Sequence, residues 1–185
     1  MQVFKFGGAS VSTPERIGAV TEILKSYAGE KLLVVVSAMG KTTNALEAVV
    51  NTFYSGDMVE ALRLFAQIKA EHLQTAENLQ VDAQILNDFF TEIEWLLHDK
   101  PVRHYDYYYD QVVCVGELLS SAIVSQYPNN AGISNEWIDV RDVVRTDNNF
   151  RDARIDWTVT AEKAASQVAP LFHHSNIVLT QGFIG

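Results

Sequence analysis

Short apolar runs and longer stretches of helical periodicity alternate along this chain, and the alternation predicts an α/β protein. Residues 3–6, 32–36 and 177–181 are apolar runs of strand length. The first run, interrupted by Lys5, predicts a short buried strand, and the β-branched content of the second predicts a strand covered on both faces. We expect a mainly parallel sheet covered by helices. Weaker strand pieces occur at residues 137–140 and 143–144.

Two helices are expected to flank the sheet-forming segments. Apolar residues recur at helical spacing after Ser12 or Thr13, either of which can cap a helix that has Pro14 in its first turn. A second helical pattern covers residues 159–172, directly before the last predicted strand. The order strand, helix, strand at both ends of the chain is typical of a parallel sheet.

The middle of the chain predicts a helical insertion at about residues 44–127. Three amphipathic stripes run through its first part, with breaks at Gly56 and at residues 80–82. Residues 112–124 then form a strongly apolar helix that carries one carboxylate, Glu117. Because a charge on an apolar helix is costly unless it is paired, Glu117 lies either on the wet face or against a polar site. The sequence alone favours the wet face.

Two loops of small residues follow the first two predicted strands. Lys5 is followed by Gly7 and Gly8, so a cation and bare N–H groups meet in an arrangement that suits a phosphate. The spacing is neither that of the P-loop nor that of the dinucleotide fingerprint, and a β-turn with a solvated lysine explains this segment equally well. Residues 37–44 form the second loop. Because ligands bind outside the carboxyl ends of parallel strands, we expect both loops to share one site.

Composition narrows the possible partners. The 185 residues include 14 Lys+Arg and 23 Asp+Glu, a net charge of −9, so long-range attraction to nucleic acid or to an anionic membrane is not expected. The single cysteine, Cys114, excludes an internal disulfide and points to a reducing compartment. No apolar run reaches the about 18 residues of a membrane span. These features predict a cytoplasmic protein.

The remaining histidines and aromatic residues are expected to be structural. His72 and His98 have no second ligand type at a useful spacing, and we interpret both as surface or half-buried residues. His173 and His174 are interpreted as residues at a helix end. The segment HYDYYYD, residues 104–110, is expected to pack between helices with its hydroxyl groups exposed. No metal site is predicted.

Five segments together resemble a known family. VFKFGGAS, VVVSAMGKTTNALE, VGELLSS, WIDVRDVVRTDNNF and TQGFIG occur in the order and approximate spacing of aspartate kinase, of the amino acid kinase superfamily. The resemblance covers residues 2–185. It departs at Ala9, where the family commonly has threonine, and this removes one hydroxyl from the expected phosphate path.

The resemblance implies a fold and a reaction. The fold is that of the amino acid kinases, similar to carbamate kinase. The reaction is attack of the side-chain carboxylate of L-aspartate on MgATP, which gives 4-phospho-L-aspartate in the first step of lysine, threonine and methionine synthesis. Lys5 then lies across the transferring phosphoryl group, and Gly7, Gly8 and Ser10 contact the phosphates. Mg²⁺ is expected to be held mainly by ATP.

The resemblance also implies the substrate contacts. Ser37, Thr43 and Glu117 match positions that bind aspartate, with Glu117 facing the α-ammonium group. Phe183 resembles the aromatic residue that closes over the pocket. Thr146 and Asp147 are expected to lie nearby.

Aspartate kinases continue beyond the matched segments into a nucleotide-binding lobe and regulatory domains. We therefore expect residues 1–185 to be the amino-acid-substrate lobe, truncated before the nucleotide lobe and inactive alone. An exposed sheet edge would favour a homo-oligomer. Two alternatives stay open. The chain could belong to a superfamily member with another carboxylate, carbamate or nucleoside monophosphate substrate, or it could be a non-catalytic binding or assembly module.

Overall fold

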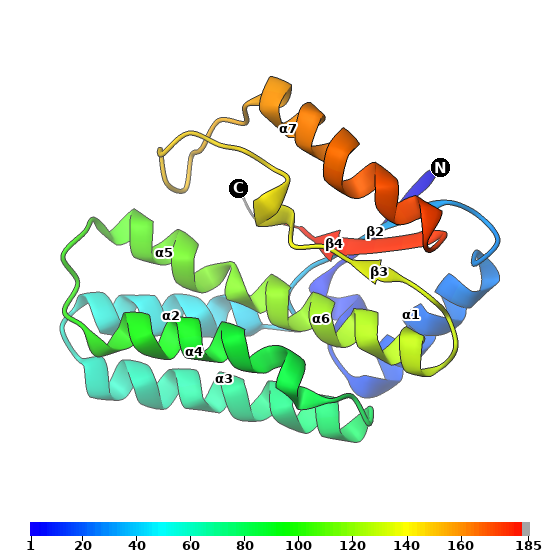
Figure 1. Ribbon diagram of the computed structural model, residues 1–185. Coiled ribbons are helices and arrows are strands. Elements are labelled where there is room, and N and C mark those ends of the chain that lie inside the picture. Colours follow the sequence, from blue (N-terminus) through cyan, green and yellow to red (C-terminus); the bar gives the residue numbers. More distant parts are fainter. Residues whose placement is uncertain (183–185) are drawn as a thin grey trace.

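The computed structural model describes residues 1–182 and contains a four-stranded sheet with helices on both faces (Figure 1). All strand pairs are parallel, and the order is β1-β2-β4-β3. The strands are β1 Gln2–Phe6, β2 Leu32–Val36, β3 Glu136–Trp137 and β4 Ile177–Gln181. The prediction of an α/β fold with a mainly parallel sheet is confirmed.

Strand β1 differs from the buried strand that its apolar run predicts. It lies at the edge of the sheet, where Val3 is 60% exposed and Lys5 is also exposed. Phe4 and Phe6 point to the opposite face and pack against the core. The prediction was wrong because an apolar run does not reveal how many neighbours a strand has. Strand β4, by contrast, is central and all five of its residues are buried.

Seven α-helices are described. They are α1 Pro14–Ser26, α2 Thr42–Tyr54, α3 Met58–Asn78, α4 Asn87–His98, α5 Tyr105–Val113, α6 Val115–Asn130 and α7 Trp157–Lys163. Shorter helical turns occur at Gly8–Val11, Ala83–Leu86, Val140–Asp142, Ala164–Val168 and Ala169–His173. Helices α1 and α6 cover one face of the sheet, and the α7 segment lies over the other (Figure 1).

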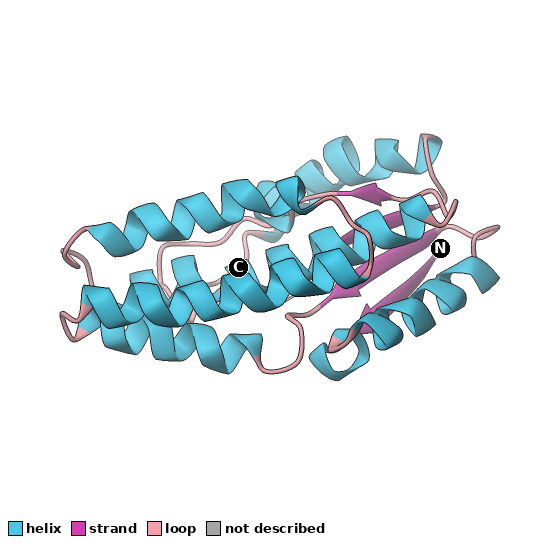
Figure 2. Cartoon of the chain, turned by 90° about the horizontal axis from the view of Figure 1, so that it is seen from below, coloured by secondary structure: helices cyan, strands magenta, loops and turns pink. Residues whose placement is uncertain are grey.

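The helical insertion forms a layer of its own. Seen from below, its long helices extend well beyond the strands (Figure 2). The predicted breaks are confirmed, since Gly56 and Gln80 have positive φ angles of 97° and 55°. At the start of the chain Thr13 is the cap of α1, and its Oγ1 accepts the N–H of Arg16 at 3.4 Å.

Two segments depart from the predicted elements. The apolar stretch 112–124 is not one helix, because α5 ends at Val113 and α6 begins at Val115. Val143 and Val144 are not a strand, since both of their N–H groups donate to the carbonyl of Val140, at 2.9 and 2.8 Å. A closed local turn therefore overrides the β-propensity of the two valines.

His72 is the histidine whose prediction was wrong. It lies inside α3 and is only 1% exposed, with Nδ1 2.7 Å from the carbonyl oxygen of Ile68. Burial lowers its pKa below the usual 6.5, since the charged ring would be desolvated. His72 is therefore a buried, neutral residue, whereas His98 is exposed as expected.

The aromatic segment HYDYYYD forms most of α5, which packs beside α2. The hydroxyl groups of Tyr105, Tyr108 and Tyr109 take part in hydrogen bonds, which the sequence did not predict. Tyr105 donates to Asn51 Oδ1 at 2.8 Å, and the Tyr108 hydroxyl accepts the N–H of Val102 at 2.8 Å. These bonds hold α5 against α2 and against the segment that precedes α5.

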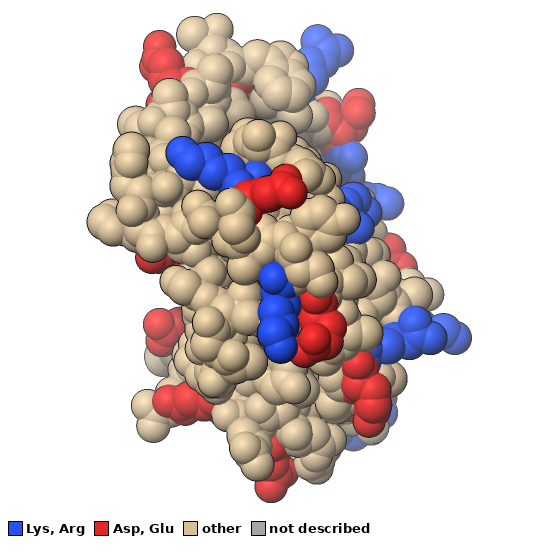
Figure 3. Space-filling view, turned by 90° about the vertical axis from the view of Figure 1, so that its right-hand side faces the viewer, with Lys and Arg blue, Asp and Glu red and all other residues tan. Residues whose placement is uncertain are grey.

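Charged side chains of both signs are mixed on one face of the molecule (Figure 3). On the face at the N-terminal ends of the strands, basic and acidic side chains lie beside one another and neither sign forms a continuous patch (Figure 3). Within residues 1–182, no helix combines the length and the apolar character that a membrane crossing requires.

Candidate active site at the carboxyl ends of the strands

Hydrogen bonds join the segments that follow three neighbouring strands. The N–H of Ser37, after β2, donates to the Phe6 carbonyl of β1 at 3.0 Å. The N–H of Gly182, after β4, donates to the Val36 carbonyl of β2 at 3.0 Å. Between the two loops, Gly40 donates to the carbonyl of Gly8 at 3.0 Å. The expected proximity of the two loops is thus confirmed.

The two adjacent glycines differ in what they allow. A Cβ at Gly8 would lie 2.6 Å from the carbonyl oxygen of Ala38 and 3.2 Å from that of Gly40, so only glycine permits this approach. A Cβ at Gly7 would meet nothing within 4 Å. Ser10 closes the turn by donating its N–H to Gly7 at 2.8 Å. Contact between loops therefore explains Gly8, whereas nothing in the described structure requires a glycine at position 7.

The Lys5 side chain lies on the face of the sheet opposite the core, close to the carboxyl end of β4. Since Phe4 and Phe6 face the core, Lys5 faces the other side of the sheet. Its stem passes the end of β4, where a Cβ at Gly182 would lie 3.9 Å from Lys5 Cε. Within residues 1–182, no ion pair of Lys5 is recorded. The charge is thus available to a bound anion.

Glu117 is buried at the same edge, in the first turn of α6. It is 2% exposed, and its Oε1 accepts the N–H of Ala38 at 3.2 Å. Its Oε2 has no hydrogen-bond partner among the described residues. Burial raises the pKa of Glu117 to about 7, against the Ala38 N–H and the positive charge of Lys5, which favour the ionised form. The preference for a wet face was wrong.

Ser37 and Thr43 lie at the two ends of the loop that joins β2 to α2. Both are half-buried, with Ser37 directly after β2 and Thr43 in the first turn of α2. No side chain caps the start of α2, so its first N–H groups add partial positive charge. Gly116 allows α6 to come this close, because a Cβ there would lie 3.0 Å from Ala38 Cβ. The Ser37–Ala38 peptide thus contacts Glu117 directly, and Thr43 lies at the start of the helix α2 against which Gly116 packs.

Ser37, Thr43 and Glu117 are not among the residues that line the cavity at Thr146 and Asp147. Thr146 and Asp147 line a cavity of about 260 Å³ between α5 and the loop at 145–153, together with Cys114 and Arg141. Asp147 Oδ1 accepts the N–H groups of Asn149 and Arg154, each at 3.1 Å, so this carboxylate shapes its own loop. Phe183 lies outside the described residues.

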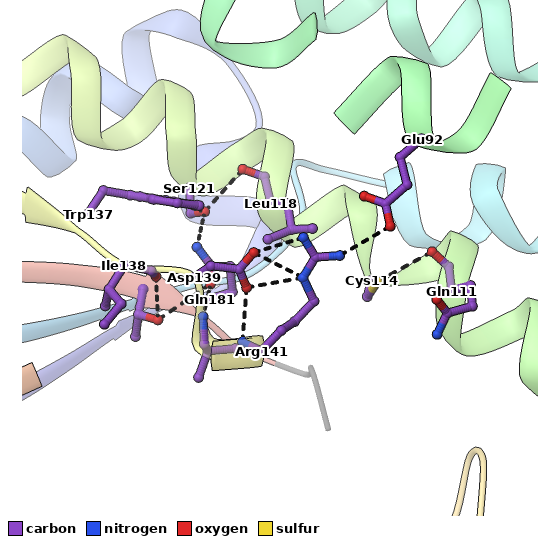
Figure 4. Close-up of polar contacts among 12 residues, drawn as sticks. Glu92, Gln111, Cys114, Leu118, Ser121, Trp137, Ile138, Asp139, Arg141 and Gln181 are labelled. Atoms are coloured by element: carbon purple, nitrogen blue, oxygen red, sulfur yellow. Dashed lines mark hydrogen bonds and ion pairs between the residues drawn. The ribbon is translucent and has the colours of Figure 1, made fainter. Parts of the chain in front are cut away.

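A polar network on α6 was missed by the sequence reasoning. Ser121 accepts hydrogen bonds from Gln181 Nε2 at 2.8 Å and from Trp137 Nε1 at 3.0 Å (Figure 4). Gln181 Oε1 in turn accepts the N–H of Val140 at 2.7 Å. The ends of β3 and β4 are thus tied to α6. The available signal was the Ser120–Ser121 pair, one turn after Glu117.

The amino acid kinase family profile matches residues 1–185. The chain belongs to the amino acid kinase family. This amino acid kinase chain is similar to the lysine-sensitive aspartokinase 3 of Escherichia coli (strain K12), with 31% identity over 99% of the chain and 40% of the relative. It is 29% identical to the chloroplastic aspartokinase 1 of Arabidopsis thaliana, over 99% of the chain and 33% of the relative.

Solved structures agree with this membership of the amino acid kinase family. The structure of E. coli aspartokinase III with aspartate and ADP matches 99% of the chain and 40% of its own length, with a TM-score of 0.85 and 29% identity. The complex of the same enzyme with lysine and aspartate gives a TM-score of 0.87 at 28% identity, over 99% of the chain and 41% of its own length. The chain therefore spans less than half of these relatives.

Proposed function

We propose that residues 1–185 form the aspartate-binding lobe of an aspartokinase, which transfers the γ-phosphoryl group of ATP to the side-chain carboxylate of L-aspartate. The observation that carries this proposal is the buried Glu117 with its free Oε2, at a strand edge that also holds Lys5 and a glycine loop. A buried carboxylate with an unused oxygen suits a cationic group of a ligand. The relatives' complexes with aspartate and ADP support the same substrates.

The chemistry needs few protein groups. A carboxylate is already a competent nucleophile, so no general base is required and catalysis depends on alignment and charge stabilisation. Glu117 Oε2 accepts a hydrogen bond from the substrate ammonium, while Ser37 and Thr43 orient the rest of the amino acid. Lys5 offsets the negative charge that develops on the transferring phosphoryl group. The N–H groups after Gly7 contact the phosphates.

Mg²⁺ enters this proposal only as a partner of ATP. Among residues 1–182, no group of three or more His, Cys, Asp or Glu side chains is arranged to hold a metal ion. The described residues thus do not fit a resident metal ion, and we expect Mg²⁺ to be held mainly by the phosphates of ATP. A metal that arrives with the nucleotide is compatible with the exposed position of Lys5.

A chimera tests the proposal, because the chain spans only 40% of the length of the E. coli relative. Residues 1–185 replace the matched segment of E. coli aspartokinase III, and ADP release is followed with aspartate as acceptor. We expect activity, and we expect Glu117→Gln to raise the KM for aspartate about 10- to 100-fold with little change in the KM for ATP, since one charge-assisted bond is lost.

The matched control is Glu71→Gln, which removes an exposed carboxylate of α3. It should leave both constants unchanged. An active chimera in which Glu117→Gln shifts neither KM, or shifts both equally, would remove Glu117 from the aspartate site.

For the chain alone we expect no turnover and millimolar affinity for aspartate, because an incomplete set of contacts loses about one to two decades of affinity per missing charged bond. Calorimetric titration measures that affinity.

A further inference from the structure

One peptide group connects the candidate site to α6. The peptide between Ser37 and Ala38 has its N–H bonded to Glu117 Oε1 at 3.2 Å. The carbonyl of the same peptide accepts a hydrogen bond from Ser120 Oγ at 2.7 Å. Glu117 and Ser120 are three residues apart and share a face of the helix. The helix therefore holds both ends of a single peptide group.

This double contact fixes the direction of the Glu117 carboxylate. If the peptide rotated about its long axis, its N–H would leave Oε1, and Oε2 would no longer be the one free oxygen. Ser120 opposes the rotation, because its side chain is fully buried and its hydroxyl donates to the carbonyl of this peptide at 2.7 Å, the usual length for such a bond. The same peptide begins the loop that leads from Ser37 to Thr43, so the hydrogen bond of Ser120 also anchors the start of that loop.

We infer that Ser120 is a positioning residue for substrate binding, which acts through the Ser37–Ala38 peptide to aim Glu117. The inference deepens the proposed function and rests on it, since it takes Glu117 as the group that meets the substrate. A purely structural role would be the alternative. The chain offers a matched control for that alternative.

The control is Ser125, on the same helix. It is also buried, at 6% exposed, and its Oγ donates a hydrogen bond of 2.7 Å to Asn135 Oδ1. Asn135 directly precedes β3, so this bond lies toward the opposite edge of the sheet from the candidate site. Ser120→Ala and Ser125→Ala remove the same chemical group and a bond of similar length, and they differ in which edge of the sheet they affect.

The first measurement is the pKa of Glu117, followed by carboxyl NMR in the 185-residue chain. Ser120→Ala should raise it by about half a unit or more, since a loosened Ala38 N–H stabilises the carboxylate less. Ser125→Ala should leave it unchanged. Ser120→Cys keeps a similar volume with a weaker donor and should give an intermediate shift. Equal shifts in Ser120→Ala and Ser125→Ala, or none in Ser120→Ala, would overturn the inference.

The second measurement uses the chimera described above. Ser120→Ala should raise the KM for aspartate about 5- to 10-fold and leave kcat within about threefold, while Ser125→Ala changes neither. If Glu117→Gln raises the KM and Ser120→Ala does not, the positioning role is wrong and the proposed function stands. If Glu117→Gln itself has no effect, the proposed function fails first. The two failures are thus distinguishable.

Discussion

Glu117 at the strand edge and His72 in the helical layer each bury one polar atom that has no hydrogen-bond partner among residues 1–182. They lie in different surroundings. His72 Nδ1 contacts the Ile68 carbonyl, so Nδ1 carries the proton and Nε2 is a bare lone pair of a neutral ring. Glu117 lies in the first turn of α6, beside two loops and within the field of Lys5.

The comparison shows that a buried polar atom without a hydrogen-bond partner does not by itself indicate a ligand site. It does so only where loops and charged groups surround it. In the helical layer a neutral histidine leaves one acceptor unused, which costs about 1–3 kcal/mol and offers nothing to a ligand. At the carboxyl ends of the strands a buried carboxylate keeps an oxygen unpaired among the described residues, beside the loop after β2 and within the field of Lys5. Substitutions in the first region should therefore change stability, and substitutions in the second should change binding or activity.

The largest effect is expected from the core of the helical layer. Phe65 in α3 is 1% exposed and packs edge-on against Phe90, with ring centroids 6.3 Å apart. Phe65→Ala should lower the free energy of unfolding by about 3–5 kcal/mol, because the lost ring leaves a cavity. Urea unfolding measures the loss, and the KM for aspartate of the folded chimera should not change.

The control for this variant is Val59→Ala, at a position of α3 that is 82% exposed. It should change the stability by less than about 0.5 kcal/mol. A change in the aspartate KM of the Phe65→Ala chimera would show that the helical layer is coupled to the site and would break the comparison.

Substitution of Lys5 should change activity and leave stability almost unchanged, the reverse of what is expected for Phe65→Ala. In the chimera, Lys5→Ala should lower kcat by about two to three orders of magnitude, since the loss of one preorganised charge contact costs about 3–4 kcal/mol of transition-state stabilisation. Its stability should stay within about 0.5 kcal/mol, because the side chain is exposed and unpaired among the described residues. Lys25→Ala on α1 is the control. Turnover of Lys5→Ala within fivefold of the unsubstituted chimera would remove Lys5 from the mechanism.

The two regions were not equally predictable from the sequence. The strands at 32–36 and 177–181 and the breaks at Gly56 and residues 80–82 follow from local patterns, and the structure confirms them. The edge position of β1 does not follow, because it depends on which strands pair far along the chain. Local periodicity therefore predicts where helices and strands occur, but not which strands lie side by side in the sheet.

The burial of His72 and of Glu117 was not predicted from residue type, although their positions in the sequence carried a signal. The buried residues of α3 recur at intervals of three or four: Ala61, Phe65, Ile68, His72 and Ala76. His72 therefore occupies a core position of the stripe. The first turns of α6 are buried on every side, from Val115 to Ser121, so this helix has no wet face for Glu117. A histidine or a glutamate suggests an exposed residue, but the position within the apolar pattern was the better guide to burial.

The next largest effect is a pH dependence caused by Glu117. Its pKa is raised from 4.5 to about 7 in the folded chain, so its contribution to stability is fully present below pH 4.5 and is lost as the pH rises through 7. Glu117→Gln removes the buried charge and should stabilise the chain above pH 7 by up to about 3 kcal/mol. Urea unfolding at pH 5 and pH 8 measures this, with Glu71→Gln as the control. A loss of stability at pH 8 would contradict the assignment of Glu117 to a binding site.

The smallest expected effect has the opposite sign and belongs to His72. Burial lowers its folded pKa below 6.5, so the unfolded chain binds the proton more readily and stability is lost as the pH falls below 6.5. At one pH unit below that value the loss is about 1.4 kcal/mol, provided that the folded ring is still neutral. Protonation would add an N–H at Nε2 that has no acceptor among the described residues, which is why the folded state resists it.

His72→Gln should remove this acid sensitivity between pH 7 and pH 5.5, while His98→Gln, at an exposed position, should preserve it. The slope is measured best in a Glu117→Gln background, since Glu117 gains stability over the same interval and would mask the loss. If the slope were the same in Glu117→Gln and in the double variant Glu117→Gln/His72→Gln, His72 would not be the group that titrates. The acid sensitivity would then not come from a buried residue of the helical layer.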